Sequence, residues 1–247
     1  MTNVSHVAMI GGGIMGGGIG QAFLQHGYEV TIRDIDDDVN EETRERIVDG
    51  NFGLERAVEG GYLTEAEKED ALDRLDFTLE IEDAVEGTDM VIEAVPEDLI
   101  LKGRVFRELD EATADDVPLL SNTSGFPIAA LANAVEDPSR VAGAHFFNPA
   151  QIMNLVEIVE TPETDPEIVE TTEAVMRDID KTPVLVDDQP NAYGFIVNRV
   201  WGAMREEAQK VVDEGLATPE EVNLAMKEGR NLPVGPLEGA GIGEEWG

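Results

Sequence analysis

The feature that most constrains this chain is a glycine-rich turn at residues 11–16, Gly-Gly-Gly-Ile-Met-Gly, which fits the pattern G-x-G-x-x-G. The residues before it, 6–11, predict a strand, and residues 14–26 predict a helix that ends at Gly27. A strand, a glycine turn and a helix in this order are typical of the unit that binds the pyrophosphate of a dinucleotide. A glycine-rich turn without a ligand is the alternative interpretation.

Each position of the turn has a physical role in such a unit. Gly11 permits the tight turn, Gly13 lets the pyrophosphate approach the backbone, and Gly16 allows the helix to pack closely on the strand. Ile14 and Met15 begin the helix, whose free N–H groups attract an anion. We therefore expect these five residues to contact the cofactor.

An acidic residue is expected about twenty residues further on, at the end of the second strand. Asp34 stands there, at the end of an expected strand over residues 28–34. Its carboxylate can accept hydrogen bonds from the ribose hydroxyls and would repel a 2′-phosphate, which favours NAD over NADP. Arg33 points to the other face of its strand, so we do not expect it to bind NADP.

Strand and helix patterns alternate through most of the chain, which predicts an α/β fold with a parallel sheet of the doubly wound Rossmann type. Further strands are expected at residues 89–95, 118–124, 141–147, 155–160 and 183–186. Helices are expected after Thr64 and after Asp165. Beyond residues 187–191 the pattern becomes entirely helical, so we place an NAD-binding domain at 1–190 and a small all-α domain at 191–247.

The charge is strongly unbalanced, with 53 acidic and 17 basic residues and a formal net charge of -36. Such a chain repels itself in dilute buffer and is suited to concentrated salt, where the repulsion is screened. We therefore expect a halophilic protein from a salt-rich cytoplasm. Nucleic acid is an improbable partner, because little positive charge is present to neutralise phosphates.

Several other classes are excluded by composition. The chain has no cysteine, which excludes disulfides and thiolate catalysis, and its three histidines are far apart, so no metal site is expected. No apolar run is long enough to span a membrane, and the first residues lack the pattern of a signal peptide. These observations predict a cytoplasmic protein without a membrane partner.

The three histidines can be sorted by position. His6 begins the first expected strand, and His26 lies in the last turn of a helix, so both are predicted to be structural. His145 ends a strand, where the carboxyl edge of an α/β sheet opens onto the ligand crevice. Because a histidine side chain changes its charge near neutral pH, His145 is the candidate general base.

The residues around His145 and four other segments resemble the 3-hydroxyacyl-CoA dehydrogenase family. The segments are, in order, Glu-Ala-Val-Pro-Glu at 93–97, Ser-Asn-Thr-Ser at 121–124, His-Phe-Phe-Asn-Pro at 145–149, Asn-Leu-Val-Glu at 154–157 and Gly-Phe-Ile-Val-Asn-Arg at 194–199. Together with the glycine turn they extend over residues 5–238. The resemblance implies an NAD-dependent oxidoreductase acting on the C3 hydroxyl or keto group of a 3-hydroxyacyl-CoA, in fatty acid metabolism.

The resemblance also implies roles for individual residues. His145 would be the general base and Glu157 would orient it and support it electrostatically. Ser124 and Asn148 would bind the reacting oxygen and hold substrate and nicotinamide, and Asn198 would contact the substrate from the second domain.

Two further residues match positions that line the ribose and nicotinamide side of the cofactor in the family. These are Glu97 and Lys102.

The sequence allows other roles for three of these residues. Glu157 could face solvent from its strand, Ser124 could cap a helix that starts near Pro127, and Asn148 could hold a turn before Pro149.

Two features depart from the family pattern. Lysines usual near residues 59–61 are replaced by glycines, with Arg56 nearby, which weakens the expectation of CoA binding. Family members usually continue beyond Glu238 with further helices, so we expect a shortened C-terminal domain. The apolar stripe over residues 196–212 would then be covered by a second copy, which predicts a homodimer.

Two other functions are also compatible with the sequence. One is a dehydrogenase of a free hydroxy acid or sugar acid, and the other is a cofactor-binding protein with little turnover.

Overall fold

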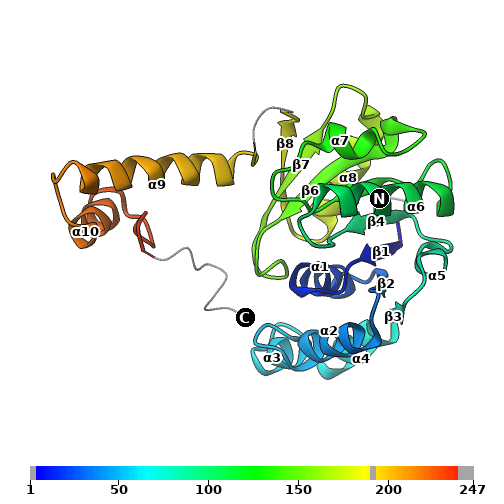
Figure 1. The fold of residues 1–247 in the computed structure, drawn as a ribbon. Coiled ribbons are helices and arrows are strands. Elements are labelled where there is room, and N and C mark those ends of the chain that lie inside the picture. The colour runs from blue at the N-terminus through cyan, green and yellow to red at the C-terminus, as the bar shows by residue number, and fades with distance from the viewer. Residues whose placement is uncertain (1–3, 190–192, 239–247) are drawn as a thin grey trace. The chain divides into compact units, whose positions relative to one another are not determined.

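The computed structural model describes residues 4–189 and 193–238. Its contacts divide the chain into two compact units, Met1–Ala192 and Tyr193–Gly247 (Figure 1). Each unit is described by itself. Within the described residues, no helix is long and apolar enough to cross a membrane.

An eight-stranded sheet with the order β3-β2-β1-β4-β5-β6-β7-β8 forms the centre of the first unit. Its strands are β1 (His6–Ile10), β2 (Glu29–Arg33), β3 (Leu75–Thr78), β4 (Met90–Glu93), β5 (Leu119–Ser121), β6 (Val141–Phe146), β7 (Leu155–Glu160) and β8 (Thr182–Asp187). The predicted α/β class and doubly wound Rossmann topology are confirmed. β3 was not predicted, because only four residues pair there.

Helices connect these strands. They are α1 (Ile14–Leu24), α2 (Asp37–Asp49), α3 (Leu54–Glu59), α4 (Glu65–Asp73), α5 (Ile81–Val85), α6 (Leu99–Ala112), α7 (Ile128–Ala132) and α8 (Pro166–Asp178), with a 3₁₀ turn at Pro138–Arg140. The capping box expected at Thr64 and Glu67 is present at the start of α4. Asp165 caps α8, whose first residue is a proline, as expected.

The strand order reverses its direction between β1 and β4. From this point β1, β2 and β3 follow one another toward one edge of the sheet, and β4, β5 and β6 follow one another toward the other edge. Because parallel crossovers are right-handed, the helices of the two halves cover opposite faces of the sheet. The crevice beyond the carboxyl ends of β1 and β4 is the place where such folds bind ligands.

The expectation of a parallel sheet holds for the first six strands but not for the last two, because β7 is antiparallel to β6 and β8 is parallel to β7. Residues 147–154 connect the two strands, and this segment is too short for the crossover helix that a parallel pair needs. The chain must therefore turn back on itself. This reversal has a consequence for the site, since it brings the end of β6 beside the start of β7.

The core of the first unit is built from apolar residues of the strands and of the helix faces packed on them. Val7, Met9, Ile92 and Leu120 are fully buried in the middle of the sheet. Strands buried on both faces are typical of doubly wound folds. The sheet is therefore a rigid frame for the residues at its carboxyl edge.

The second unit contains α9 (Val197–Asp213) and α10 (Pro219–Arg230). Thr218 and Glu221 form a capping box at the start of α10. Asn231, with a positive φ of 53°, ends that helix.

Candidate active site

The glycine turn has the geometry that a dinucleotide requires. Gly11 has a φ of 108°, which side chains rarely adopt, and a Cβ there would lie 2.7 Å from the carbonyl oxygen of Ala94. A Cβ on Gly16 would overlap the carbonyl oxygen of Gly11. Both positions therefore need glycine so that α1 can pack closely against β1 and β4.

Gly13 is different, because a Cβ built on it meets no atom within 4 Å. Gly13 is the residue before α1, and Ile14 beside it is exposed. The backbone N–H groups at the start of α1 thus face an open space in which an anion can bind. Met15 packs on the core and fixes the helix to the sheet. These features fit the pyrophosphate of NAD.

Asp34 follows β2 and is tied to the turn. Its Oδ2 accepts a hydrogen bond of 2.7 Å from the backbone N–H of Gly12, and its Oδ1 accepts one from the N–H of Ile35. Arg33 points away, since its Nε donates to the carbonyl oxygen of Leu79. Sequence reasoning missed Arg46 of α2, whose guanidinium donates to the carbonyl oxygen of Gly12 at 3.0 Å.

His145 and Glu157 form a buried pair. They lie directly opposite each other in the antiparallel register of β6 and β7, and His145 Nδ1 is 2.8 Å from Glu157 Oε2. His145 is 5% exposed and Glu157 is 1% exposed. A carboxylate at Nδ1 places the ring proton there, so Nε2 is the nitrogen that can accept a proton. Glu157 does not face solvent.

The other histidines lie away from this pair. His6 Nε2 is 2.9 Å from Thr31 Oγ1 on the neighbouring strand. His26 lies just beyond the end of α1, with Nδ1 2.8 Å from the carbonyl oxygen of Ala22 and Nε2 3.4 Å from Asp180 Oδ2. These contacts are those of structural residues.

Glu97 and Ser124 are in direct contact although 27 residues separate them. Glu97 Oε1 accepts hydrogen bonds from Thr123 Oγ1 at 2.7 Å, from the Ser124 backbone N–H at 3.0 Å and from Ser124 Oγ at 3.2 Å. Partial burial raises the pKa of Glu97, but the Thr123 hydroxyl, the Lys102 charge and the Ser124 N–H together lower it below its ordinary value. Glu97 is therefore ionised at neutral pH.

Lys102 lies deeper than the resemblance implied, with 1% of its surface exposed. Its Nζ is 2.8 Å from Glu93 Oε1, 3.1 Å from the carbonyl oxygen of Val95 and 3.3 Å from Glu97 Oε2. Sequence reasoning missed Glu93, because a carboxylate in an apolar strand carries no signal for its partners.

The turn that contains Asn148 lies between β6 and β7. Asn148 is half-buried and precedes Pro149 through a cis peptide bond. Lys181, which the sequence did not single out, donates to the carbonyl oxygens of Ala150 and Met153 and so holds the turn. Asn198 lies at the second position of α9, in the other unit.

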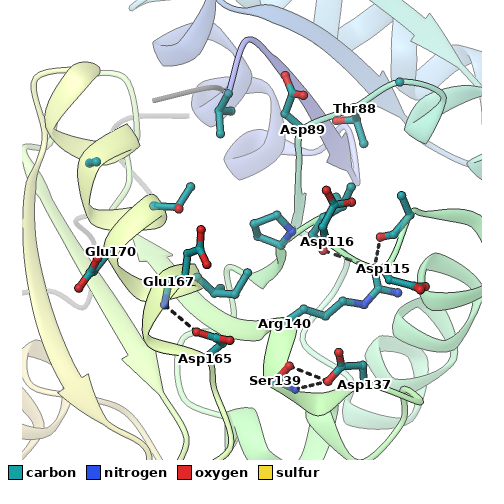
Figure 2. Close-up of a pocket in the computed structure, with 18 of the residues that line it drawn as sticks. Thr88, Asp89, Asp115, Asp116, Asp137, Ser139, Arg140, Asp165, Glu167 and Glu170 are labelled. Atoms are coloured by element: carbon teal, nitrogen blue, oxygen red, sulfur yellow. Dashed lines mark hydrogen bonds between the residues drawn. The ribbon is translucent and has the colours of Figure 1, made fainter. Parts of the chain in front are cut away.

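A hollow of about 1020 Å³ lies at the opposite edge of the sheet, where β4, β5 and β6 begin (Figure 2). Eight carboxylates line it: those of Asp89, Asp115, Asp116, Asp137, Asp165, Glu167, Glu170 and Asp178. Its one arginine, Arg140, forms an ion pair with Asp110 at 2.7 Å. The hollow contains none of the candidate site residues and is distant from the carboxyl edge where the glycine turn and His145 lie.

A doubly wound sheet whose carboxyl edge carries both the glycine turn and a buried histidine–carboxylate pair defines the class of nicotinamide-dependent dehydrogenases. Residues 6–189 match the family model of the 3-hydroxyacyl-CoA dehydrogenase NAD binding domain, and residues 194–241 match that of the 3-hydroxyacyl-CoA dehydrogenase C-terminal domain. The chain belongs to the 3-hydroxyacyl-CoA dehydrogenase family, as the sequence resemblance indicated.

Individual relatives agree with this assignment. The chain is 39% identical to 3-hydroxyadipyl-CoA dehydrogenase of Escherichia coli over 96% of its own length, and spans about half (49%) of that protein. It is 35% identical to the mitochondrial hydroxyacyl-coenzyme A dehydrogenase of Sus scrofa, with 95% of this chain and 74% of that protein covered. The crystal structure of (S)-3-hydroxybutyryl-CoA dehydrogenase from Ralstonia eutropha superposes with a TM-score of 0.90 at 36% identity, covering 95% of this chain and 80% of that one.

Proposed function

We propose that this protein transfers a hydride between NAD and the C3 carbon of a 3-hydroxyacyl-CoA. The observation that carries the proposal is the buried pair of His145 and Glu157 at the same edge of the sheet as the glycine turn. Oxidation of a secondary alcohol needs a base for the hydroxyl proton, and this pair is suited to that task. Bound NAD supplies the hydride acceptor.

His145 is the general base in this proposal. Glu157 accepts a hydrogen bond from the Nδ1–H group of His145, so the Nε2 lone pair is available to the substrate hydroxyl and takes its proton. When the ring becomes charged, the Glu157 carboxylate stabilises it, because both groups are shielded from water. In the reverse direction the same Nε2 returns the proton to the keto oxygen.

Ser124 and Asn148 hydrogen-bond the reacting oxygen, and Asn198 contacts the substrate from the second domain. The contact between Ser124 and Glu97 supports this role for Ser124, since it fixes the serine backbone at the carboxyl end of β5. Gly11, Gly13, Ile14, Met15, Gly16 and Asp34 hold the cofactor, together with Glu97.

The direct test is the absorbance at 340 nm with acetoacetyl-CoA and NADH in molar KCl. We expect NADH to be oxidised. Turnover of a free 3-keto acid but not of its CoA ester would replace this proposal by a dehydrogenase of a free hydroxy acid. The ion pair of Arg56 with Glu59 supports that alternative, because it engages the arginine that stands near the glycines at the expected CoA-binding segment. Binding of NADH without turnover of either compound would indicate a cofactor-binding protein.

NAD should bind at least tenfold more tightly than NADP, a difference of roughly 1.4 kcal/mol. The Asp34 carboxylate is fixed by Gly12 and would lie against the 2′-phosphate of NADP. Calorimetric titration with both cofactors measures the ratio, and Asp34→Asn should reduce it. Equal affinities in the wild-type protein would contradict the assignment.

We also propose that the protein works in a salt-rich cytoplasm. With a net charge of -36, screening at molar salt relieves the repulsion between carboxylates, because the Debye length falls to about 3 Å. The melting temperature should therefore be higher in molar KCl than in dilute buffer. A melting temperature independent of salt would show that the charge does not limit stability.

We propose a homodimer formed through the C-terminal helices. The proposed domains are the NAD-binding domain at residues 1–190 and the small helical domain at residues 191–247. Within α9 the apolar side chains of Val197 and Val200 are exposed, and Trp201 and Met204 are partly so. A self-complementary patch of this kind closes into a dimer. Light scattering should report about twice the 26.8 kDa chain mass.

Trp201→Glu should shift this dimer toward the monomer, because a charge would be buried in the interface. Ala203→Glu adds the same charge at an exposed position on the opposite side of α9 from Trp201 and should leave the dimer intact. A wild-type protein that is strictly monomeric would refute the proposal.

A further inference from the structure

The carboxyl end of β4 contains a buried group that the proposed mechanism does not use. We propose that Glu93 is a positioning residue of the cofactor site, which neutralises Lys102 so that one negative charge remains on Glu97 beside the nicotinamide half of NAD. The site thereby favours the oxidised cofactor, whose nicotinamide ring is positively charged, over the neutral reduced ring. This inference rests on the proposed binding of NAD.

Glu93 is fully buried, and both of its carboxylate oxygens accept hydrogen bonds. Oε1 accepts from Lys102 Nζ at 2.8 Å and from the Val95 backbone N–H at 2.7 Å, and Oε2 accepts from Ser121 Oγ at 2.6 Å. A carboxylate that only accepts hydrogen bonds, one of them from an ammonium group, is held in its ionised form. Burial, the largest influence, raises the pKa of Glu93, and Lys102 opposes this shift.

Lys102 connects Glu93 to the surface of the site. Its ammonium lies between two carboxylates, at 2.8 Å from Glu93 Oε1 and 3.3 Å from Glu97 Oε2. These three groups carry two negative charges and one positive charge. Because Glu93 is 0% exposed and the Glu97 side chain is 32% exposed, a bound ligand meets the remaining negative charge at Glu97.

The topology places the nicotinamide half of the cofactor near Glu97. The pyrophosphate binds at the start of α1 after β1, and the adenosine ribose binds at Asp34 after β2. The other half of the dinucleotide must therefore extend the opposite way, over the ends of β4 and β5. Glu97 follows β4, and its partners Thr123 and Ser124 follow β5.

Glu93→Gln removes the charge and keeps the contacts. The glutamine oxygen can accept from Lys102 and Val95, and its amide can donate to Ser121 Oγ, whose hydroxyl rotates. Lys102 and Glu97 then form a neutral pair. We expect the affinity for NAD⁺ to fall about tenfold and the affinity for NADH to change less than threefold. Calorimetric titration with each form measures both affinities without turnover.

A second variant separates charge from structure. Adding Lys102→Met to Glu93→Gln leaves Glu97 as the one charged group of the three, so the preference for NAD⁺ should return toward the wild-type ratio. Asp89→Asn is the matched control, since it removes a carboxylate at the other end of β4, where Asp89 accepts hydrogen bonds from Ser5 and His6. It should leave both affinities unchanged.

The outcomes are distinguishable. The role of Glu93 would be refuted if Glu93→Gln left the ratio of the NAD⁺ and NADH affinities unchanged, including by an equal fall of both. It would also be refuted if the double variant did not recover the ratio. Either result would leave the proposed function intact. A wild-type protein that binds neither NAD⁺ nor NADH would overturn both. The melting temperature of each ligand-free variant shows whether a change in affinity comes from unfolding.

Discussion

Replacing His145 by glutamine should lower the turnover number by about 10²–10⁴-fold, which is the range a positioned general base contributes. The affinity for NADH should be nearly unchanged, because the base acts on the substrate proton and not on the cofactor. Steady-state kinetics with acetoacetyl-CoA and NADH measure the first quantity, and fluorescence titration with NADH measures the second. A variant that turns over at the wild-type rate would remove His145 from the mechanism.

The environment of His145 requires two controls. Glu157 is 1% exposed, so a variant that leaves its charge without a partner can lose stability as well as activity. His145→Asn keeps an amide near the Nδ1 position for Glu157 and still lacks Nε2, so it should be equally inactive. His26→Gln alters a histidine that contacts Ala22 and Asp180 away from the candidate site, and it should keep the wild-type rate.

Glu157→Gln should lose less activity than His145→Gln, since it weakens the orientation of the base without removing it. In the double variant the losses should not add, because both residues act through one proton transfer. Additive losses would mean that Glu157 has a separate role.

The glycine turn and the cofactor-binding edge were predictable from the sequence because their causes are local. The strand, the turn, the helix and Asp34 lie within about thirty residues, and backbone conformation at Gly11 and steric contact at Gly16 require glycine whatever the rest of the chain does. The position of His145 was predictable for a related reason. The carboxyl ends of the strands in this fold open onto the ligand crevice, and His145 lies near the end of one of them.

The partners of buried charges were not predictable from local sequence, and the pairing of Glu157 with His145 was implied only by the family resemblance. The 2.8 Å contact of Glu157 with His145 depends on the reversal of β7, which the sequence pattern of alternating strands and helices did not reveal. Lys102 matched a cofactor position in the family, yet its burial against Glu93 follows from the packing of α6 on the end of β4. Such contacts join segments through the tertiary fold, and sequence spacing carries little information about them.

Gly13→Ala should weaken NAD binding by about a hundredfold, on the order of 3 kcal/mol, while leaving the fold unchanged. Gly13 has a φ of −60° and a Cβ there meets no protein atom within 4 Å, so alanine fits the free protein. The methyl group would, however, occupy the space through which the pyrophosphate approaches the N–H groups of α1. Losing two charge-assisted hydrogen bonds of roughly 1.5 kcal/mol each accounts for the magnitude.

Two other glycines show whether this loss comes from the ligand or from the fold. Gly16→Ala places its Cβ on the carbonyl oxygen of Gly11, so it should lower the melting temperature as well as the affinity. Gly103→Ala lies in α6, where the nearest atom to the new Cβ is 4.0 Å away, and it should keep the affinity and gain up to about 1 kcal/mol of stability. Calorimetric titration with NAD and thermal unfolding of the ligand-free variants separate the three cases. Wild-type NAD affinity in Gly13→Ala would mean that the pyrophosphate does not approach this turn, because a ligand bound there cannot avoid the added methyl group.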